Sequence, residues 1–176
     1  MIRSGFGKTV ARRLLIGSLA LVIPATAGCE AGLNAPTLEF HPASTGAHVA
    51  VNNIAITNVF VLGAPSGSTL PTGSSASVFL SLFNAGSSKD ALLSAKSPTA
   101  GTVQLSGGSV SLPVGSPVNL TGPQPSVVLS GLTKPLVAGT DIVLTLNFEN
   151  AGQVTFEVPV QPQSYEFSTY SPPATP

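Results

Sequence analysis

The feature that most constrains this chain is a pair of alternating apolar runs between Asp141 and Val160. In residues 142–148 every second side chain is large and apolar, and the same alternation returns in residues 154–160. Successive side chains of a strand point to opposite faces, so each run presents one apolar face. The connection, residues 149–152 (ENAG), is short and carries Asn and Gly, which predicts a β-hairpin. Two apolar faces side by side need cover, which the rest of the chain must supply.

Short runs of β-forming residues, separated by turns rich in Gly, Pro, Asn and Ser, make up most of the remaining chain. Counting the hairpin, they predict about eight or nine strands at the spacing typical of β-sandwiches. The expected fold is all-β: an antiparallel, immunoglobulin-like sandwich of two sheets. The 114 residues from Ala47 to Val160 are enough for one core but not for two, so one domain is expected over residues 48–162.

Two stretches of the expected sandwich carry more specific predictions. Residues 49–62 begin with alternating apolar side chains and end in a continuous apolar run, Val59–Leu62. This change of pattern indicates either a β-bulge or a strand that is buried on both sides. Residues 106–109 (SGGS) lie between two short apolar runs and predict a tight hairpin.

The N-terminus has the composition of a bacterial lipoprotein signal peptide, residues 1–28. Four basic residues precede an apolar run, residues 14–27, which is too short to span a bilayer comfortably. Small residues then lead directly to Cys29, the only cysteine of the chain. An ordinary secretory signal that happens to end near a cysteine is the alternative. We expect Cys29 to be lipidated and to anchor the chain on the outer, extracytoplasmic face of the cell membrane.

The segments on either side of the expected domain lack strand patterns. Residues 29–47 carry two prolines and no apolar period, which predicts a flexible tether. Residues 163–176 are rich in proline and predict a disordered tail. Within that tail, Tyr165, Phe167 and Tyr170 alternate loosely, which leaves an extra edge strand or a contact site as the alternative.

The charge of the mature chain argues against two classes of partner. Four of the seven Lys and Arg residues lie in the signal, so the chain from Cys29 onward has three lysines against seven carboxylates and a net charge of −4. Mild acidity without a basic cluster argues against nucleic acid and against binding to an anionic membrane surface. The membrane contact is therefore expected through the lipid anchor alone.

No constellation of catalytic residues is visible, and we predict that the protein is not an enzyme. Serine is abundant, but no histidine lies deep in the domain to act as its base. Glu149 and Glu157 flank the hairpin turn and are candidates for a carboxylate pair, although exposed carboxylates on a strand are usually only solvated. Asn119, in the sequence Asn-Leu-Thr, matches a glycosylation pattern by chance in a bacterial lipoprotein.

One weak metal site is conceivable near the start of the domain. His41 and His48 are the only histidines of the chain, and Glu39 lies close to them in the sequence. A flexible pair of histidines binds Cu(II) or Zn(II) loosely. Apart from Met1, which leaves with the signal, the chain has no methionine, so its side chains cannot build a Met/His site for Cu(I).

Several stretches of the domain resemble the PCuAC family of extracytoplasmic copper chaperones, which deliver Cu(I) during cytochrome oxidase assembly. They occur in the family's order over residues 50–160. They are Asn84–Leu93, Ser97-Pro98 with Thr102–Leu105, Leu129–Leu136 with Gly139, and Leu144–Phe148 through Gly152 to Val160. The resemblance implies a cupredoxin-like Greek-key sandwich.

The departures from the PCuAC pattern fall on the positions of its copper ligands. The family places a histidine directly after its Val-Glu-Leu segment, whereas here Val103–Leu105 is followed by Ser106. The loop that carries methionine ligands in the family shrinks to residues 107–109. The closing His-x-Met pair is replaced by Ser126 and Val128. Hydroxyl and isopropyl groups do not replace imidazole and thioether as Cu(I) ligands.

The layout of the whole chain also resembles the LpqE type of actinobacterial lipoprotein, which has the same lipobox and a degenerate site. Two hypotheses follow. The first is a non-enzymatic binding or assembly scaffold without a cofactor, whose partner is another envelope protein. The alternative is a copper-handling protein whose site has moved to His41 and His48.

Overall fold

The computed structural model describes residues 46–121 and 126–173 of the chain. Across these two ranges the chain forms twelve strands and one short 3-10 helix, with no α-helix. The elements are β1 (Ala47–Val51), β2 (Ile54–Leu62), β3 (Thr69–Leu70), β4 (Ala76–Asn84), β5 (Asp90–Lys96), β6 (Ala100–Leu105), β7 (Val110–Leu112), β8 (Pro117–Leu120), β9 (Val127–Leu132), β10 (Leu136–Val137), β11 (Asp141–Phe148), β12 (Gln153–Gln161) and η3 (Tyr165–Phe167). Of the helices in the described part of the chain, none has the length and apolarity needed to cross a bilayer.

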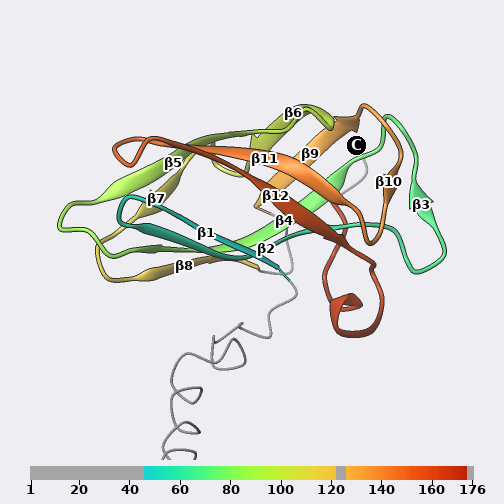
Figure 1. Ribbon diagram of the computed structural model, residues 1–176, viewed down its shortest axis with the longest axis horizontal. Helices are drawn as coiled ribbons and strands as arrows, with labels where there is room; N and C mark the ends of the chain where they lie inside the picture. The colour runs from blue at the N-terminus through green and yellow to red at the C-terminus, as the bar shows by residue number, and fades with distance from the viewer. Residues whose placement is uncertain (1–45, 122–125, 174–176) are drawn as a thin grey trace, which may run out of the picture. The chain divides into compact units, whose positions relative to one another are not determined.

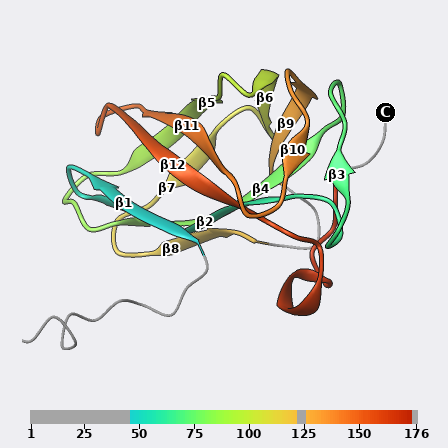
Figure 2. The same ribbon diagram turned by 45° about the vertical axis from the view of Figure 1, so that its right-hand side comes forward.

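Ten of the strands form one hydrogen-bonded ribbon that folds into two layers. One layer has the order β6-β9-β4-β2, with β1 added to β2 and β8 added to β4, and the other has the order β12-β11-β5-β7. Figures 1 and 2 show β5 and β11 above β2 and β8. The layers are joined by a short parallel pairing, in which Val160 and Gln161 of β12 lie opposite Val61 and Leu62 of β2. The expected all-β sandwich is confirmed.

The hairpin expected between Asp141 and Val160 is present as β11 and β12. The two strands pair in one register from Asp141 opposite Pro159 to Asn147 opposite Gln153. The turn closes where the N–H of Phe148 donates to the carbonyl of Gly152 at 2.8 Å. The even-numbered apolar residues of β11 are buried, and those of β12 are buried or half-buried, so the alternation in the sequence does correspond to one inward face.

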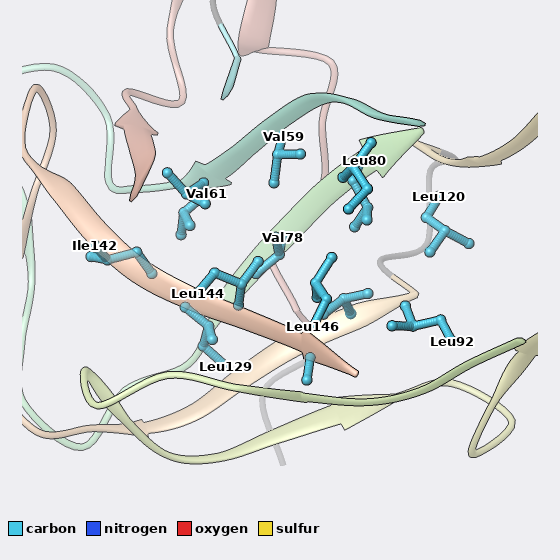
Figure 3. Close-up of a cluster of buried hydrophobic side chains, with 14 of the residues drawn as sticks. Val59, Val61, Val78, Leu80, Leu92, Leu120, Leu129, Ile142, Leu144 and Leu146 are labelled. Carbon is cyan, nitrogen blue, oxygen red and sulfur yellow. The ribbon is translucent and has the colours of Figure 1, made fainter. Parts of the chain in front are cut away.

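The main core lies between the two layers. Figure 3 shows valine and leucine side chains of β2, β4 and β9 converging on Ile142, Leu144 and Leu146 of β11. Leu144 and Leu146 are fully buried. Each such side chain contributes about 1.5–3 kcal/mol by leaving water, so this layer-to-layer contact is the principal stabilisation of the sandwich.

The expected irregularity in residues 49–62 is real, and both of its readings are correct. The region is two strands, β1 and β2, and the pairing of β2 with β4 slips at Asn58, whose φ is +54°. Beyond this bulge, Val59 and Val61 point into the main core. Phe60 and Leu62 are also buried, but in a separate cluster on the outer side of the sheet. The bulge thus allows the end of β2 to be covered on both faces.

The hairpin predicted at residues 106–109 is wrong. A turn exists there, and Gly107 and Gly108 both have positive φ, +83° and +80°. However, β6 pairs with β9 in one layer, whereas β7 pairs with β5 in the other. The SGGS turn therefore carries the chain from one layer to the other instead of closing a local pair. Turn chemistry alone does not distinguish these two outcomes.

The disordered tail predicted for residues 163–176 is also wrong over residues 163–173, the part that the structure describes. This segment turns back after β12 and forms η3, and Figures 1 and 2 show it as a red curl beyond the strand. Phe167 is buried and Tyr170 packs beside it against Phe60 and Phe79. Of the three aromatic residues that the alternative named, Phe167 and Tyr170 do make contacts, with the chain's own sheet, whereas Tyr165 is exposed and no edge strand forms.

Candidate functional site

The positions that the PCuAC resemblance assigned to copper ligands meet at one end of β6 and β9. Ser106 follows β6 and Ser126 precedes β9, and the N–H of Ser106 donates to the carbonyl of Ser126 at 2.8 Å. Val128 lies two residues into this pair, opposite Gln104 of β6. Segments about twenty residues apart in sequence are thus brought together, as a ligand site of this family would require.

The side chains at this place do not fit copper. Ser106, Ser126 and Val128 offer two neutral hydroxyls and an isopropyl group, which lack the soft donors that Cu(I) prefers. Within residues 46–121 and 126–173, no group of three or more His, Cys, Asp or Glu side chains is placed to hold a metal ion. No chemical step through copper can be derived from these residues.

The stretch of the PCuAC resemblance that begins at Asn84 has a structural role centred on Asp90. This carboxylate is 6% exposed. Its Oδ1 accepts from the N–H groups of Ala91 at 2.7 Å and Asn150 at 3.0 Å, and its Oδ2 accepts from the N–H of Ala151 at 2.8 Å. Burial alone would raise the pKa of this carboxyl, but the backbone N–H groups hold the pKa below its ordinary value. Asp90 therefore acts as an ionised clasp between β5 and the β11–β12 turn.

Asn84 is a second clasp at the same end of the sandwich. Its Nδ2 donates to the carbonyl of Ser88 at 2.8 Å and to the carbonyl of Leu112 at 3.1 Å, while its Oδ1 accepts from the N–H of Gly86 at 2.9 Å. A Cβ at Gly86 would lie 3.0 Å from that same Oδ1, so the glycine keeps the turn close to the amide. A cavity of about 270 Å³ adjoins these loops. Since both Nδ2 and Oδ1 of Asn84 bond to backbone groups, we infer that this side chain stabilises the loops at this end of the sandwich.

Ser97, in another resembling stretch, also holds backbone. Its Oγ donates to the carbonyl of Val143 at 2.7 Å and accepts from the N–H of Thr99 at 3.2 Å. This fixes the turn at which the chain passes from β5 in one layer to β6 in the other. The resemblance to PCuAC domains is thus carried by residues that build the scaffold.

The histidine site has only one of its three members in the described part of the chain. His48 lies in β1 and not in a tether, and its side chain is exposed. It falls where the pairing of β1 with β2 is irregular, between Ala47 and Val49. His41, Glu39 and the predicted lipidation site Cys29 lie outside the described residues.

The carboxylate pair is not formed. Glu157 lies opposite Val143 in the hairpin register, and Val143 is six positions before Glu149, which follows β11. Asn119 is an exposed residue of β8 opposite Ser81. Neither place brings together groups that suit acid–base chemistry.

A cluster that sequence reasoning did not assign lies on the outer side of β2 and β4. Phe60 and Phe79 stack with ring centroids 5.2 Å apart, and Phe167 and Tyr170 close over them. A cavity of about 390 Å³ adjoins the cluster, with Asn58, Ser81 and Asn119 among its lining residues. The sequence did carry a signal for it: in β2 and β4 the residues between the core-facing ones, such as Phe60, Leu62 and Phe79, are also apolar.

The family model described as "Putative lipoprotein LpqE-like" matches residues 54–160. This chain belongs to the LpqE-like family. It is 30% identical over 163 residues to "Putative lipoprotein LpqE" of Mycobacterium leprae (strain TN), covering 85% of this chain and 88% of the relative. The protein of the same description in Mycobacterium tuberculosis (strain ATCC 25618 / H37Rv) is 27% identical over 157 residues, covering 82% and 86%.

Solved structures similar to the LpqE-like chain are PCuAC domains. The structure titled "Copper-bound PCuAC domain from PmoF2" has a TM-score of 0.56 and 26% identity, covering 66% of this chain and 98% of that one. "Apo PCuAC domain from PmoF1" has a TM-score of 0.58 at 22% identity, covering 66% and 99%. The resemblance to PCuAC domains and to LpqE is therefore confirmed, and with it the cupredoxin-like sandwich.

Proposed function

We propose that this LpqE-like protein is a non-enzymatic, membrane-anchored scaffold that binds another envelope protein through a PCuAC-like domain. The observation that carries the proposal is the pairing of Ser106 with Ser126 beside Val128, which supplies no copper donor at the place where the resemblance puts the ligands. The stretches that resemble PCuAC domains still serve the fold, because Asp90, Asn84 and Ser97 bond to backbone groups elsewhere in the domain. We infer that the fold was kept and the copper chemistry was lost.

A metal titration tests the loss of copper binding. The soluble chain from Glu30 to Pro176 is titrated with Cu(I) and Cu(II) against a competing chelator. We expect no Cu(I) binding in competition with the chelator, because hydroxyls are poor ligands for a soft ion. Stoichiometric Cu(I) binding that is lost on changing Ser106 or Ser126 to alanine would contradict the proposal.

The binding role is tested by capture from solubilised envelope. The lipidated protein is cross-linked in cells, purified in detergent, and compared with a variant that changes only the exposed surface beside Ser106. We expect one envelope protein to be enriched with the parent chain. Repeated failure to enrich any specific protein would count against the scaffold.

The anchor of the proposal is Cys29 at the end of the signal peptide. A diacylglycerol on this cysteine would hold the domain at the extracytoplasmic face of the membrane through the segment before β1. Cys29→Ser is expected to abolish labelling by radioactive palmitate and to prevent lipoprotein processing. Unchanged labelling in this variant would show that the anchor lies elsewhere.

A copper-handling role with a relocated site is the second candidate. It is favoured by the exposure of His48 on β1 and by the copper in the similar PCuAC structure. Under this proposal His41 joins His48 in binding Cu(II). Changing both histidines to alanine in the titration discriminates the two roles: Cu(II) affinity falls at least tenfold if the pair is the site, and is unchanged if it is not.

A further inference from the structure

The strand β6 forms an open border of the sandwich. It pairs with β9 alone, so the described residues provide no hydrogen-bonding partner on its other side. The strand before it is also open over part of its length, because β7 pairs with β5 only at residues 90–92 and leaves residues 93–96 without a partner on that side. Two unpaired strand edges therefore follow one another in the chain, before and after the turn that contains Ser97.

The backbone groups that face the open side of β6 follow from its register with β9. The N–H of Ser106 donates to the carbonyl of Ser126 at 2.8 Å. In an antiparallel pair, residues that bond to the partner strand alternate with residues whose N–H and C=O point away from it. Gln104, two residues before Ser106, therefore bonds to β9, whereas the N–H and C=O of Val103 point to the open side.

The strand β6 lacks the features that usually keep an open edge from pairing. Natural edge strands are very short, carry proline or lysine, or are irregular. β6 has six residues, AGTVQL, with neither a proline nor a charge. By contrast, β7 has three residues, β8 has four and begins with Pro117, and β1 is irregular near its start. Of these four strands, β6 is the one best able to accept a further strand.

A cavity of about 460 Å³ adjoins this open edge, lined by residues 94–97 and 100–103. Its apolar wall comes from Ala95 and Ala100, which are buried, and from Val103, which is half-buried. A strand added to β6 lies about 4.8 Å away, and every second side chain of such a strand points to the same face. The cavity therefore suits the apolar side chains of an added strand.

The charge around the cavity favours an acidic segment. Lys96 lines the cavity. Lys134 is close by in the chain fold, because it follows Thr133, whose N–H donates to the carbonyl of Thr99 in the turn before β6, at 2.9 Å. From Cys29 onward the chain has three lysines and no arginine, so two of its three basic side chains lie here. Within the described residues neither lysine pairs with a carboxylate, which leaves both for a partner.

We propose that β6 is a docking edge, which accepts an extended, acidic segment of another envelope protein as an added strand. This inference rests on the proposed scaffold function and names how the partner is bound. The segment bonds to the N–H and C=O of Val103, directs apolar side chains into the cavity, and places a carboxylate near Lys96 and Lys134. Backbone pairing supplies affinity in this mode of recognition, and the side chains supply selectivity.

A peptide titration tests the docking edge. The full lipoprotein in detergent is titrated with a fluorescent peptide of alternating valine and threonine that carries a glutamate at each end. We expect saturable binding, which becomes about tenfold weaker when one alternate set of peptide nitrogens is methylated and stays unchanged when the other set is methylated, because only one edge of the peptide faces β6. Equal effects of the two methylated peptides, or no saturable binding, would overturn the proposal.

Variants of the protein test the same contacts from the other side. Val103→Pro removes the N–H at the open edge, where proline is tolerated, and should weaken peptide binding about tenfold, whereas Val103→Ala keeps the N–H and most of the binding. Lys96→Glu combined with Lys134→Glu should weaken binding several-fold, most strongly at low salt. Lys89→Glu, at an exposed lysine outside the cavity, is the matched control. Parent-like binding by Val103→Pro would overturn the proposal, and if that variant does not fold, the methylated peptides decide.

Capture from cross-linked cells separates this inference from the scaffold function. Under the proposal, the parent protein enriches an envelope protein that Val103→Pro and the paired lysine variant do not. If the parent and Val103→Pro enrich the same protein equally, the scaffold function stands and the docking edge is wrong. If the parent enriches no protein, the scaffold function fails, while the peptide titration still decides whether β6 accepts a strand.

Discussion

At the scale of single residues, Asp90 is a polar side chain whose removal should clearly destabilise the fold. Asp90→Ala would leave the backbone N–H groups of Ala91, Asn150 and Ala151 without this acceptor, and the contact to Ala151 is buried. We expect the free energy of unfolding to fall by about 3 kcal/mol, the usual range for hydrogen bonds to a charged group. Urea unfolding at neutral pH measures this. Asp141→Ala, an exposed carboxylate at the start of β11, is the control and should change little.

Asp90 also predicts a pH dependence. Its pKa is lowered in the folded state, so the unfolded chain binds the proton more readily. The contribution of Asp90 is therefore fully present above the unfolded pKa of about 3.9 and is lost as the pH falls through the lower folded value. Stability measured from neutral pH to about pH 2 should decrease on acidification, and Asp90→Asn should flatten this decrease. If stability decreases equally steeply in Asp90→Asn, the pH dependence arises from other carboxylates.

At Gly46 there is no room for a side chain, which gives a third prediction. A Cβ at this position would lie 2.6 Å from the backbone carbon of Asn58 and 2.8 Å from the backbone nitrogen of Val59. Since backbone at a bulge cannot move aside freely, Gly46→Ala should destabilise the fold by about 2 kcal/mol. Gly101→Ala is the matched control, because its nearest contact would be an ordinary 3.5 Å. Equal unfolding midpoints for the two variants would show that the backbone before β1 shifts and accommodates the added Cβ.

For single residues, the sequence predicted which positions come together but not which side chains stabilise the fold. Ser106, Ser126 and Val128 were predicted to form one place, and the structure does bring them together. The role of Asp90 was not predicted, because its partners are N–H groups from a turn about sixty residues away. A sequence shows which side chains exist, whereas a clasp depends on which backbone lies beside them.

At the scale of elements, the clearest prediction comes from the C-terminal strap (residues 162–173). It covers an apolar groove on the outer side of β2 and β4, which is formed by Phe60, Leu62 and Phe79. Phe167→Ala removes a ring that is 6% exposed and contacts Phe60, whereas Tyr165 is 83% exposed. We expect Phe167→Ala to cost about 3 kcal/mol and to increase binding of a hydrophobic dye as the groove opens. Tyr165→Ala should do neither. Thermal unfolding and dye fluorescence of the two variants, measured side by side, test this, and identical behaviour would mean that the strap does not cover the groove.

Strands and hairpins were predictable where burial sets the alternation of apolar residues. They were not predictable where the outcome depends on which distant strand is the hydrogen-bonding partner. The β11–β12 hairpin followed from alternation alone, because both strands lie against the same core. The turn at residues 106–109 looked the same locally but joins two layers, since the partners of β6 and β7 are distant strands. The strap was missed because its proline content suggested disorder, while its aromatic residues fit a groove that appears only after β2 and β4 are in place.

At the scale of the whole domain, the two layers depend on the short parallel pairing of β2 with β12. Val61 and Val160 are partners there, near opposite ends of the described chain. A chain ended after Gly152 lacks β12 and so loses this pairing and one side of β11. We expect it to show no cooperative transition in urea, whereas a chain ended after Gln161, which lacks only the strap and the residues beyond it, should retain one. Cooperative unfolding of the shorter chain would show that the first layer folds by itself.

The same pairing has a consequence for how the protein is made. Because Val61 must wait for Val160, the first long strand emerges from a ribosome or a translocation channel well before its last neighbour. Contacts between such distant parts of a chain form slowly. During this interval the apolar residues of β2 are exposed to proteases and to other unfinished chains. The first layer of the domain is therefore without its link to the second layer until nearly all of the described chain has been made.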